Sequence, residues 1–84
     1  MPIKETSDFK KDLEELPREA IEIYKKQKQI FSTNWLDSRL HTKRLKELSG
    51  VHSFRVTRRY RVLFYFQEKT AIFFKIGHRK DIYE

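Results

Sequence analysis

Residues 52–76 read HSFRVTRRYRVLFYFQEKTAIFFKI, and this stretch decides the fold. Three runs rich in β-branched and aromatic side chains, residues 52–57, 60–66 and 70–76, are separated by short polar segments. Such a pattern is typical of β-strands joined by turns. Because both connections are short, neighbouring strands are expected to run antiparallel. The sequence therefore predicts a three-stranded meander.

Upstream of these strands, apolar residues recur every three or four positions from Ser7 to Phe31. This spacing places them on one side of a helix, with the charged residues on the other side. Pro17 fits the first turn of a helix and disfavours helix at the residue before it. We therefore expect two consecutive amphipathic helices, over about residues 7–16 and 17–30. Residues 2–5 are predicted to form a short fourth strand, and residues 32–50 stay mostly unassigned.

The length of 84 residues suits one domain with one modest core, so residues 1–84 are interpreted as a single domain. The expected fold class is α+β, with the two N-terminal helices packed on one face of a three- to four-stranded, mainly antiparallel sheet. Cysteine is absent, which excludes disulfides and thiolate chemistry. No apolar run approaches the ~18 residues that span a bilayer, and no export signal is recognisable. We therefore expect a soluble, cytoplasmic protein without a membrane partner.

The positive charge of the chain is concentrated after residue 31. The formal net charge is +7, whereas residues 1–31 hold equal numbers of acidic and basic side chains. An excess of this size attracts polyanions, nucleic acid first, because each neutralised phosphate releases a counterion. A well-solvated surface without a ligand is the alternative interpretation.

The pairing of the first two strands follows from the need to bury apolar side chains. A three-residue connection, residues 57–59, would place Phe54 opposite Val62 on the face toward the helices. Arg55 would then lie directly opposite Arg61 on the other face, with ~5 Å between their Cβ atoms.

The second connection extends this row of charges. With residues 67–69 as the loop, Lys75 would also lie opposite Arg61, on the face that the helices leave uncovered. Like charges directly opposite one another destabilise a sheet by a few tenths to ~1 kcal/mol each. We therefore expect an anion on this face, and guanidinium groups match phosphate in geometry. The alternative is an exposed face on which the long side chains splay apart.

The sequence ends with Gly77-His-Arg-Lys-Asp-Ile-Tyr83 and Glu84. This segment, with Phe9-Lys-Lys-Asp-Leu13, Leu45-Lys-Glu-Leu-Ser-Gly50 and Tyr60-Arg-Val-Leu-Phe64, resembles the RelE/ParE superfamily of type II toxins, in particular its RelE-like branch. The likeness covers nearly the whole chain. It implies an endoribonuclease, or mRNA interferase, that inhibits translation by cutting messenger RNA on the ribosome. It also implies a cognate acidic antitoxin that silences the toxin in a hetero-oligomeric complex.

The resemblance also implies roles for particular residues. Arg61 matches the arginine of the central strand that contacts the scissile phosphate, Arg79 matches an arginine near the chain end, and Tyr83 matches the terminal tyrosine or acid–base group. Arg55 and His78 stand where RelE has lysines. The general base therefore stays open between His78 and Tyr83.

Metal-free RNA cleavage needs a base for the 2′-hydroxyl, charge stabilisation for the phosphorane and an acid for the 5′ oxygen. Arginines cannot deprotonate at neutral pH, so Arg55, Arg61 and Arg79 are expected to act as an electrostatic clamp. His78 or Tyr83 would transfer protons. The histidines are scattered, so neither a metal nor another cofactor is expected.

Further RNA contacts are expected at two sets of residues. The basic residues are expected to bind phosphates, ribosomal RNA included: Lys43, Arg44, Lys46 and Lys75. Tyr65 and Phe73 are candidates for stacking on a base, whereas Trp35 is interpreted as a core anchor. Two other functions remain possible: a ParE-like toxin that poisons DNA gyrase, and a non-catalytic member that only binds nucleic acid or an antitoxin.

Overall fold

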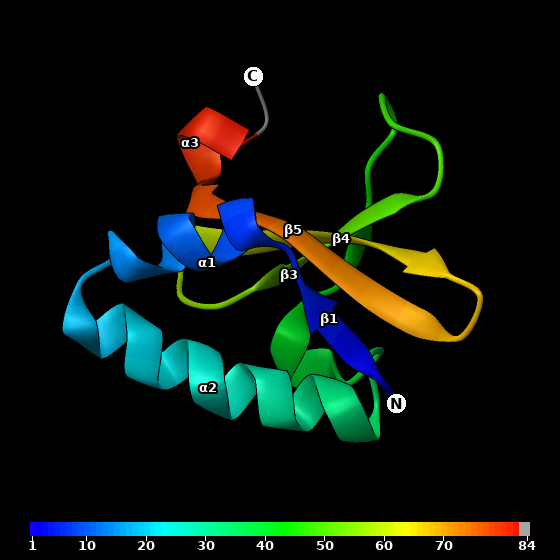
Figure 1. Ribbon diagram of the computed structural model, residues 1–84, viewed down its shortest axis with the longest axis horizontal. Coiled ribbons are helices and arrows are strands. Elements are labelled where there is room, and N and C mark those ends of the chain that lie inside the picture. The colour runs from blue at the N-terminus through cyan, green and yellow to red at the C-terminus, as the bar shows by residue number, and fades with distance from the viewer. Residues whose placement is uncertain (83–84) are drawn as a thin grey trace.

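In the computed structural model, which describes residues 1–82, a five-stranded mixed sheet carries helices on both faces (Figure 1). The strand order is β1-β5-β4-β3-β2, and every neighbouring pair is antiparallel except β1 with β5. The elements, in chain order, are β1 (Ile3–Glu5), α1 (Ser7–Glu14), α2 (Arg18–Thr33), the 3₁₀ turn η1 (Ser38–Leu40), β2 (Lys43–Arg44), β3 (Val51–Arg55), β4 (Tyr60–Gln67), β5 (Thr70–His78) and α3 (Arg79–Ile82).

The two N-terminal helices begin and end where local chemistry directs. Thr6 caps α1, since its Oγ1 accepts the backbone N–H of Phe9 at 3.1 Å. The helix stops before Leu16-Pro17, and α2 begins directly after the proline. The predicted pair of helices is therefore confirmed, with α2 beginning one residue and ending three residues later than expected. The predicted strand at residues 2–5 is confirmed as β1.

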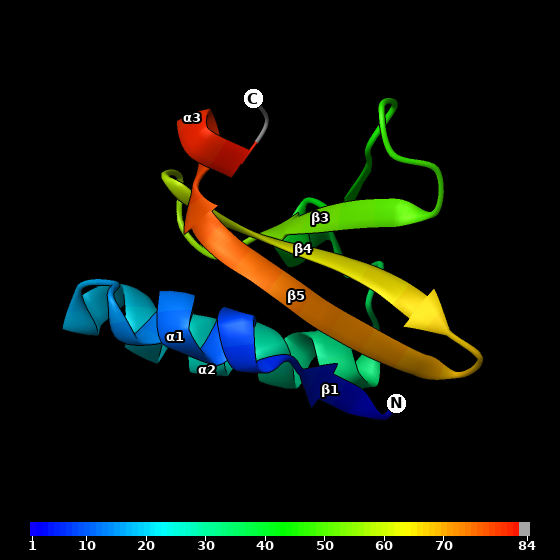
Figure 2. The ribbon, with the colours of Figure 1, turned by 45° about the horizontal axis from the view of Figure 1, so that its top comes forward.

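One face of the sheet carries the main core. Phe9 of α1 and Tyr24 and Phe31 of α2 are buried, and their ring centroids lie 5.8, 6.4 and 5.0 Å from that of Phe73 on β5. Figure 2 shows α1 and α2 together on this side of the sheet, with α3 on the other side. Trp35 packs against the core as a partly buried ring, as predicted.

The predicted register of the first hairpin is confirmed. Phe54 pairs with Val62, and Arg55 pairs with Arg61. The backbone N–H of Val56 donates to the Tyr60 carbonyl at 2.9 Å, and Thr57 Oγ1 accepts the N–H groups of Arg59 and Tyr60. The Thr57 hydroxyl thus organises the connection that places the two arginines opposite each other.

The predicted register of the second hairpin is wrong. Gln67 pairs with Thr70, so the connection has two residues, of which Glu68 adopts a positive φ of 57°. A β-bulge then interrupts the β4–β5 pairing between Leu63 and Phe64, and Leu63 pairs with Lys75. The short turn brings one set of β5 side chains into the core, and the extra residue at the bulge restores the inward direction of the residues after it.

Two residues of β5 lie in other places than the sequence predicted. Phe73 is completely buried, whereas we expected it on the open face, and Phe74 lies on the other face instead. Lys75 lies opposite Leu63 rather than Arg61, whose β5 neighbour is Gly77. The two-residue turn places Phe73 opposite Phe64 in the core, and the bulge after it shifts Lys75 to Leu63 and returns Ile76 to the same core.

Three described elements were not predicted from the sequence. The 3₁₀ turn η1 has three residues, strand β2 has two and pairs with β3 at the sheet edge, and α3 is a single turn of helix at the end of β5. None of them is long enough to produce a periodic pattern. Among residues 1–82, no helix combines the length and the apolar character that crossing a membrane would require.

Candidate nucleic-acid interface

The candidate site lies on the face of the sheet opposite α1 and α2. Strand pairing defines two rows across this face. The first row is Arg55, Arg61 and Gly77, and the second is Lys43, Ser53, Leu63 and Lys75. Because side chains alternate along each strand, the members of both rows project toward the same side. We call this surface the basic face.

Arg61 is the most enclosed charge of the basic face, with a residue exposure of 5%. Its Nε donates to Ser53 Oγ at 3.1 Å, and its NH2 group donates to the carbonyl of His41 at 2.7 Å. A buried guanidinium keeps its charge and needs such acceptors, because burying it without them is costly. These bonds fix the orientation of the cation.

The basic face is less open than the sequence suggested. Leu63 and Ile72 are 3% and 4% exposed, so this side of the sheet holds a second small core. Ile82 of α3 contributes to it, since its side chain lies 3.5 Å from where a Cβ on Gly77 would stand. The two N-terminal helices leave this face uncovered, as expected, but α3, which was not predicted, folds back over the end of β5.

Arg55 and Arg79 surround the buried Arg61 with more accessible charge. Arg55 is half-buried at the end of β3, where its carbonyl accepts the side-chain amide of Gln27 from α2 at 2.9 Å. Arg79 is exposed at the start of α3, and its backbone N–H donates to the carbonyl of Arg59 at 2.7 Å. Within residues 1–82, neither of these two guanidinium groups forms an ion pair.

Three arginines belong to this end of the sheet, each from a different element. Arg55 ends β3, Arg61 is the second residue of β4, and Arg79 follows the last residue of β5. His78 lies one pair further along the same strands: it pairs with Tyr60, so its side chain projects to the other side from Arg61, and its ring lies edge-on to the Tyr60 ring, with 5.9 Å between centroids. Tyr83 lies outside the described residues.

The basic residues that were predicted to bind flanking phosphates lie in two places. Lys43 and Lys75 lie at opposite ends of the second row of the basic face, and both are exposed. Arg44 follows Lys43 and therefore projects to the other side of β2. With Lys46 it lines a shallow hollow of about 470 Å³ whose other walls are Leu45 and Ser49. Lys75 also borders a second hollow, shared with the acidic side of α1.

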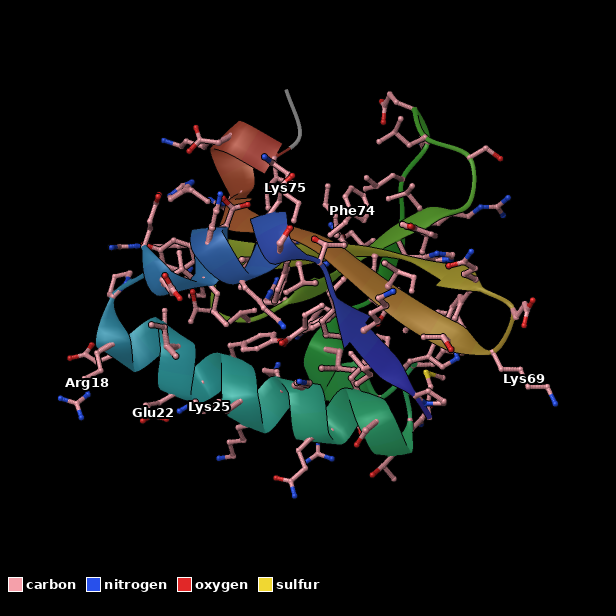
Figure 3. All side chains as sticks on the ribbon, in the orientation of Figure 1. Arg18, Glu22, Lys25, Lys69, Phe74 and Lys75 are labelled. Carbon is pink, nitrogen blue, oxygen red and sulfur yellow. The ribbon has the colours of Figure 1, made fainter. Side chains whose placement is uncertain are left out.

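An exposed aromatic pair lies on the same side as the basic face. Tyr65 and Phe74 have ring centroids 5.6 Å apart and an interplanar angle of 52°. Figure 3 marks Phe74 next to Lys75 on β5, with Lys69 at the far tip of the β4–β5 hairpin. Phe73 cannot stack on a base, since it is enclosed by the core. Phe74 takes its place as the candidate.

Sequence analysis missed the residues that hold the site in position. Ser53, the His41 carbonyl and the Gln27 amide fix Arg61 and Arg55. Only Ser53 left a usable pattern, because a serine inside an apolar strand and on the same face as an arginine indicates a hydrogen-bond partner. The His41 carbonyl depends on a left-handed backbone conformation, φ 47°, which no sequence motif announces.

The described residues at this end of the sheet do not form a metal site. Across residues 1–82, no three histidine, cysteine, aspartate or glutamate side chains lie close enough together to hold a metal ion. The chemistry available at the described end of the sheet is thus that of guanidinium groups, one imidazole and hydroxyl groups.

Solved structures share this architecture over their full length. A chain in the RelB–RelE antitoxin–toxin complex from Methanococcus jannaschii is 26% identical, with a TM-score of 0.78, and the match covers 95% of this chain and 94% of that chain. The fold is that of the RelE-like toxins.

More distant structures agree in fold. YafQ from Escherichia coli strain BL21(DE3) is 16% identical with a TM-score of 0.79, over 98% of this chain and 97% of that chain. The YoeB/ParE toxin from Agrobacterium tumefaciens is 14% identical with a TM-score of 0.77, over 94% and 99%. No protein-family model matches the sequence, and neither does any curated protein.

Proposed function

We propose that this RelE-like chain is the toxin of a type II toxin–antitoxin system and an endoribonuclease that inhibits translation by cutting messenger RNA on the ribosome in the cytoplasm. One observation supports the proposal: Arg55 and Arg61 are paired on β3 and β4, and Arg79 follows the end of β5 two residues after Gly77, the β5 partner of Arg61, so all three belong to one end of the sheet. Opposed arginines weaken a sheet, so their juxtaposition favours an anionic ligand.

In the proposed reaction the three arginines act on the scissile phosphate. The 2′-oxygen attacks the phosphorus, the P–O5′ bond breaks, and a 2′,3′-cyclic phosphate and a 5′-hydroxyl result. Arg55 and Arg79 supply accessible guanidinium groups for the phosphorane, and the buried Arg61 supplies a fixed positive field. One preorganised donor of this kind is worth about 3 kcal/mol, or a hundredfold in rate.

Proton transfer is assigned to two candidates. The 2′-hydroxyl must lose a proton and the leaving 5′ oxygen must gain one. We assign these steps to His78, at the end of β5, or to Tyr83, because imidazole and phenol groups can both give and take a proton. The exposed lysines Lys43 and Lys75, together with Arg44 and Lys46, would hold the flanking phosphates of messenger and ribosomal RNA.

An acidic antitoxin is the proposed protein partner. The net charge of +7 favours a partner of opposite sign. Several structural neighbours were crystallised in toxin–antitoxin complexes, RelE with RelB in two archaeal complexes and YafQ with DinJ. By analogy, binding of the antitoxin would neutralise the basic side of this chain.

The test is expression of the chain in bacteria with a matched set of variants. Wild type should arrest growth and cut messenger RNA, and Arg79→Ala should relieve both. Arg18→Ala is the control, since Arg18 lies on the outer side of α2 (Figure 3). Unchanged far-UV circular dichroism and an unchanged urea midpoint show that each variant is folded.

Two results would contradict the proposal. Intact messenger RNA together with inhibited supercoiling by gyrase would indicate the ParE-like activity instead. RNA that binds with a steep salt dependence but stays uncut would indicate a non-catalytic member.

A further inference from the structure

His78 occupies the position of a helix cap. It is the residue before α3, and its Nδ1 accepts the backbone N–H of Lys80 at 3.1 Å. A side-chain acceptor at this position normally satisfies the N–H group two or three residues later, and it is usually supplied by Ser, Thr, Asp or Asn. Here an imidazole nitrogen does the same.

The helix that His78 caps needs such support. With four residues, α3 is far below the ~12–15 residues at which isolated helices become marginally stable. Three contacts hold it: the cap, the bond from the Arg79 N–H to the Arg59 carbonyl, and the buried side chain of Ile82 over Gly77. Of these, only the cap depends on a titratable group.

The cap exists in one protonation state of the imidazole. Nδ1 accepts a hydrogen bond only while it carries no proton, so the remaining N–H of neutral His78 lies at Nε2. In the imidazolium both nitrogens are donors, and Nδ1–H would then face the Lys80 N–H. Histidine side chains make this change within the physiological range of pH.

The surroundings of His78 are mainly cationic. On β4 and the connection before it, Tyr60 contacts the ring, and Arg59 and Arg61 are its neighbours in sequence. On the other side, α3 contributes Arg79, Lys80 and one acid, Asp81. Protonation of His78 would thus add a positive charge to a segment that already carries Arg79 and Lys80 and a single acid, Asp81.

We propose that His78 is a positioning residue whose neutral imidazole caps α3 and thereby holds Arg79 at the arginine cluster, and that protonation of His78 releases the helix. The consequence for cleavage rests on the proposed function, whereas the capping itself does not. This assignment leaves proton transfer to another group and makes the arrangement of the site dependent on pH.

Two variants separate capping from proton transfer. His78→Asn keeps a side-chain acceptor but cannot titrate, and His78→Ala has no acceptor. Hydrogen exchange of the Lys80 amide, corrected for the intrinsic effect of pH, reports on α3 without any RNA. In wild type, exchange should accelerate about fivefold as the His78 ring signals shift on acidification. The Ala variant should exchange fast throughout, and the Asn variant should show no step.

Cleavage of messenger RNA by the same variants gives the second readout. The Asn variant should keep most of the cleavage activity that the Ala variant loses. Its activity should not fall on acidification, whereas that of wild type should. Equal loss of cleavage in both variants, with the Lys80 amide still protected in the Asn variant, would overturn the proposal in favour of proton transfer. The proposal would also be overturned if the Lys80 amide of His78→Ala exchanged at the same rate as in wild type. If wild type cuts no RNA at any pH, the proposed function fails, yet the exchange data still decide the capping.

Discussion

Arg61 combines a permanent charge with almost complete burial. Ser53 Oγ and the His41 carbonyl accept its hydrogen bonds, and Arg55 stands directly opposite on β3. Removing one partner of a buried hydrogen bond costs about 1–3 kcal/mol. Removing the charge of Arg61 also removes its repulsion with Arg55, and this recovers part of the lost stability.

Arg61→Ala should therefore destabilise the fold by about 1–2 kcal/mol in urea unfolding, because two acceptors lose their donor. Arg55→Ala, its partner across the strands, should change the free energy of unfolding by less than about 0.5 kcal/mol, since Arg55 is only half-buried. Equal stability of wild type and Arg61→Ala would show that the hydrogen bonds of the buried guanidinium contribute nothing net.

Tyr24 joins α2 to β1 through its hydroxyl, which donates to the Glu5 carboxylate, and Lys28 forms an ion pair with the same carboxylate at 3.2 Å. Burial, then the hydrogen bond, then the charge of Glu5 raise the pKa of Tyr24 far above its ordinary value. The phenol thus stays neutral in the folded protein at a pH where the unfolded chain ionises it.

The free energy of unfolding should consequently decline as the pH rises above about 10, where the unfolded chain begins to lose this proton. Tyr24→Phe lacks the group, so its decline should be shallower by up to about 1.4 kcal/mol per pH unit. Chemical denaturation between pH 9 and 11.5 measures both. Parallel curves for the two proteins would refute the raised pKa.

At the scale of elements, the register of β5 decides which of its aromatic side chains lie in the core. Phe73 contacts rings from both N-terminal helices, whereas Phe74 meets Tyr65 on the opposite side of the sheet. Neighbouring residues of identical type therefore have different environments, and substitutions at the two positions form a matched pair.

Phe73→Ala should lower the free energy of unfolding by about 3–5 kcal/mol, because it leaves a cavity among buried rings. Phe74→Ala should cost far less, since its side chain is only half-buried, and should weaken RNA binding by about 1–3 kcal/mol if the ring stacks on a base. Urea unfolding and filter binding give the two values. A larger stability loss for Phe74→Ala would contradict the register.

The two hairpins differ in how well the sequence predicts their register. The first hairpin was predictable because only one register buries Phe54 and Val62 while keeping Arg55 out of the core. In the second hairpin, Phe73 and Phe74 are chemically identical, so alternation could not decide which of them is inside. A three-residue turn without a bulge and a two-residue turn followed by a bulge are the alternative registers, and the packing of Phe73 against Phe9 and Phe31 favours the second.

At the scale of the whole molecule, the chain separates a neutral helical half from a basic half that contains most of the sheet. The arginines were predictable as a set, since strand order brings Arg55 to Arg61 and ends β5 beside them. Their enclosure was not predictable, because the single turn of α3 and the left-handed His41 are fixed by tertiary contacts rather than by local propensity.

The central claim is that guanidinium groups from β3, β4 and α3 act together on one phosphate, and single-turnover cleavage of ribosome-bound messenger RNA tests it most directly. Arg55→Ala and Arg79→Ala should each slow cleavage about a hundredfold, and the double variant should be slowed by a factor that differs from the product of the two, because the groups share one transition state. Arg18→Ala should stay within about twofold of wild type. Cleavage at the wild-type rate by the folded double variant would contradict the account.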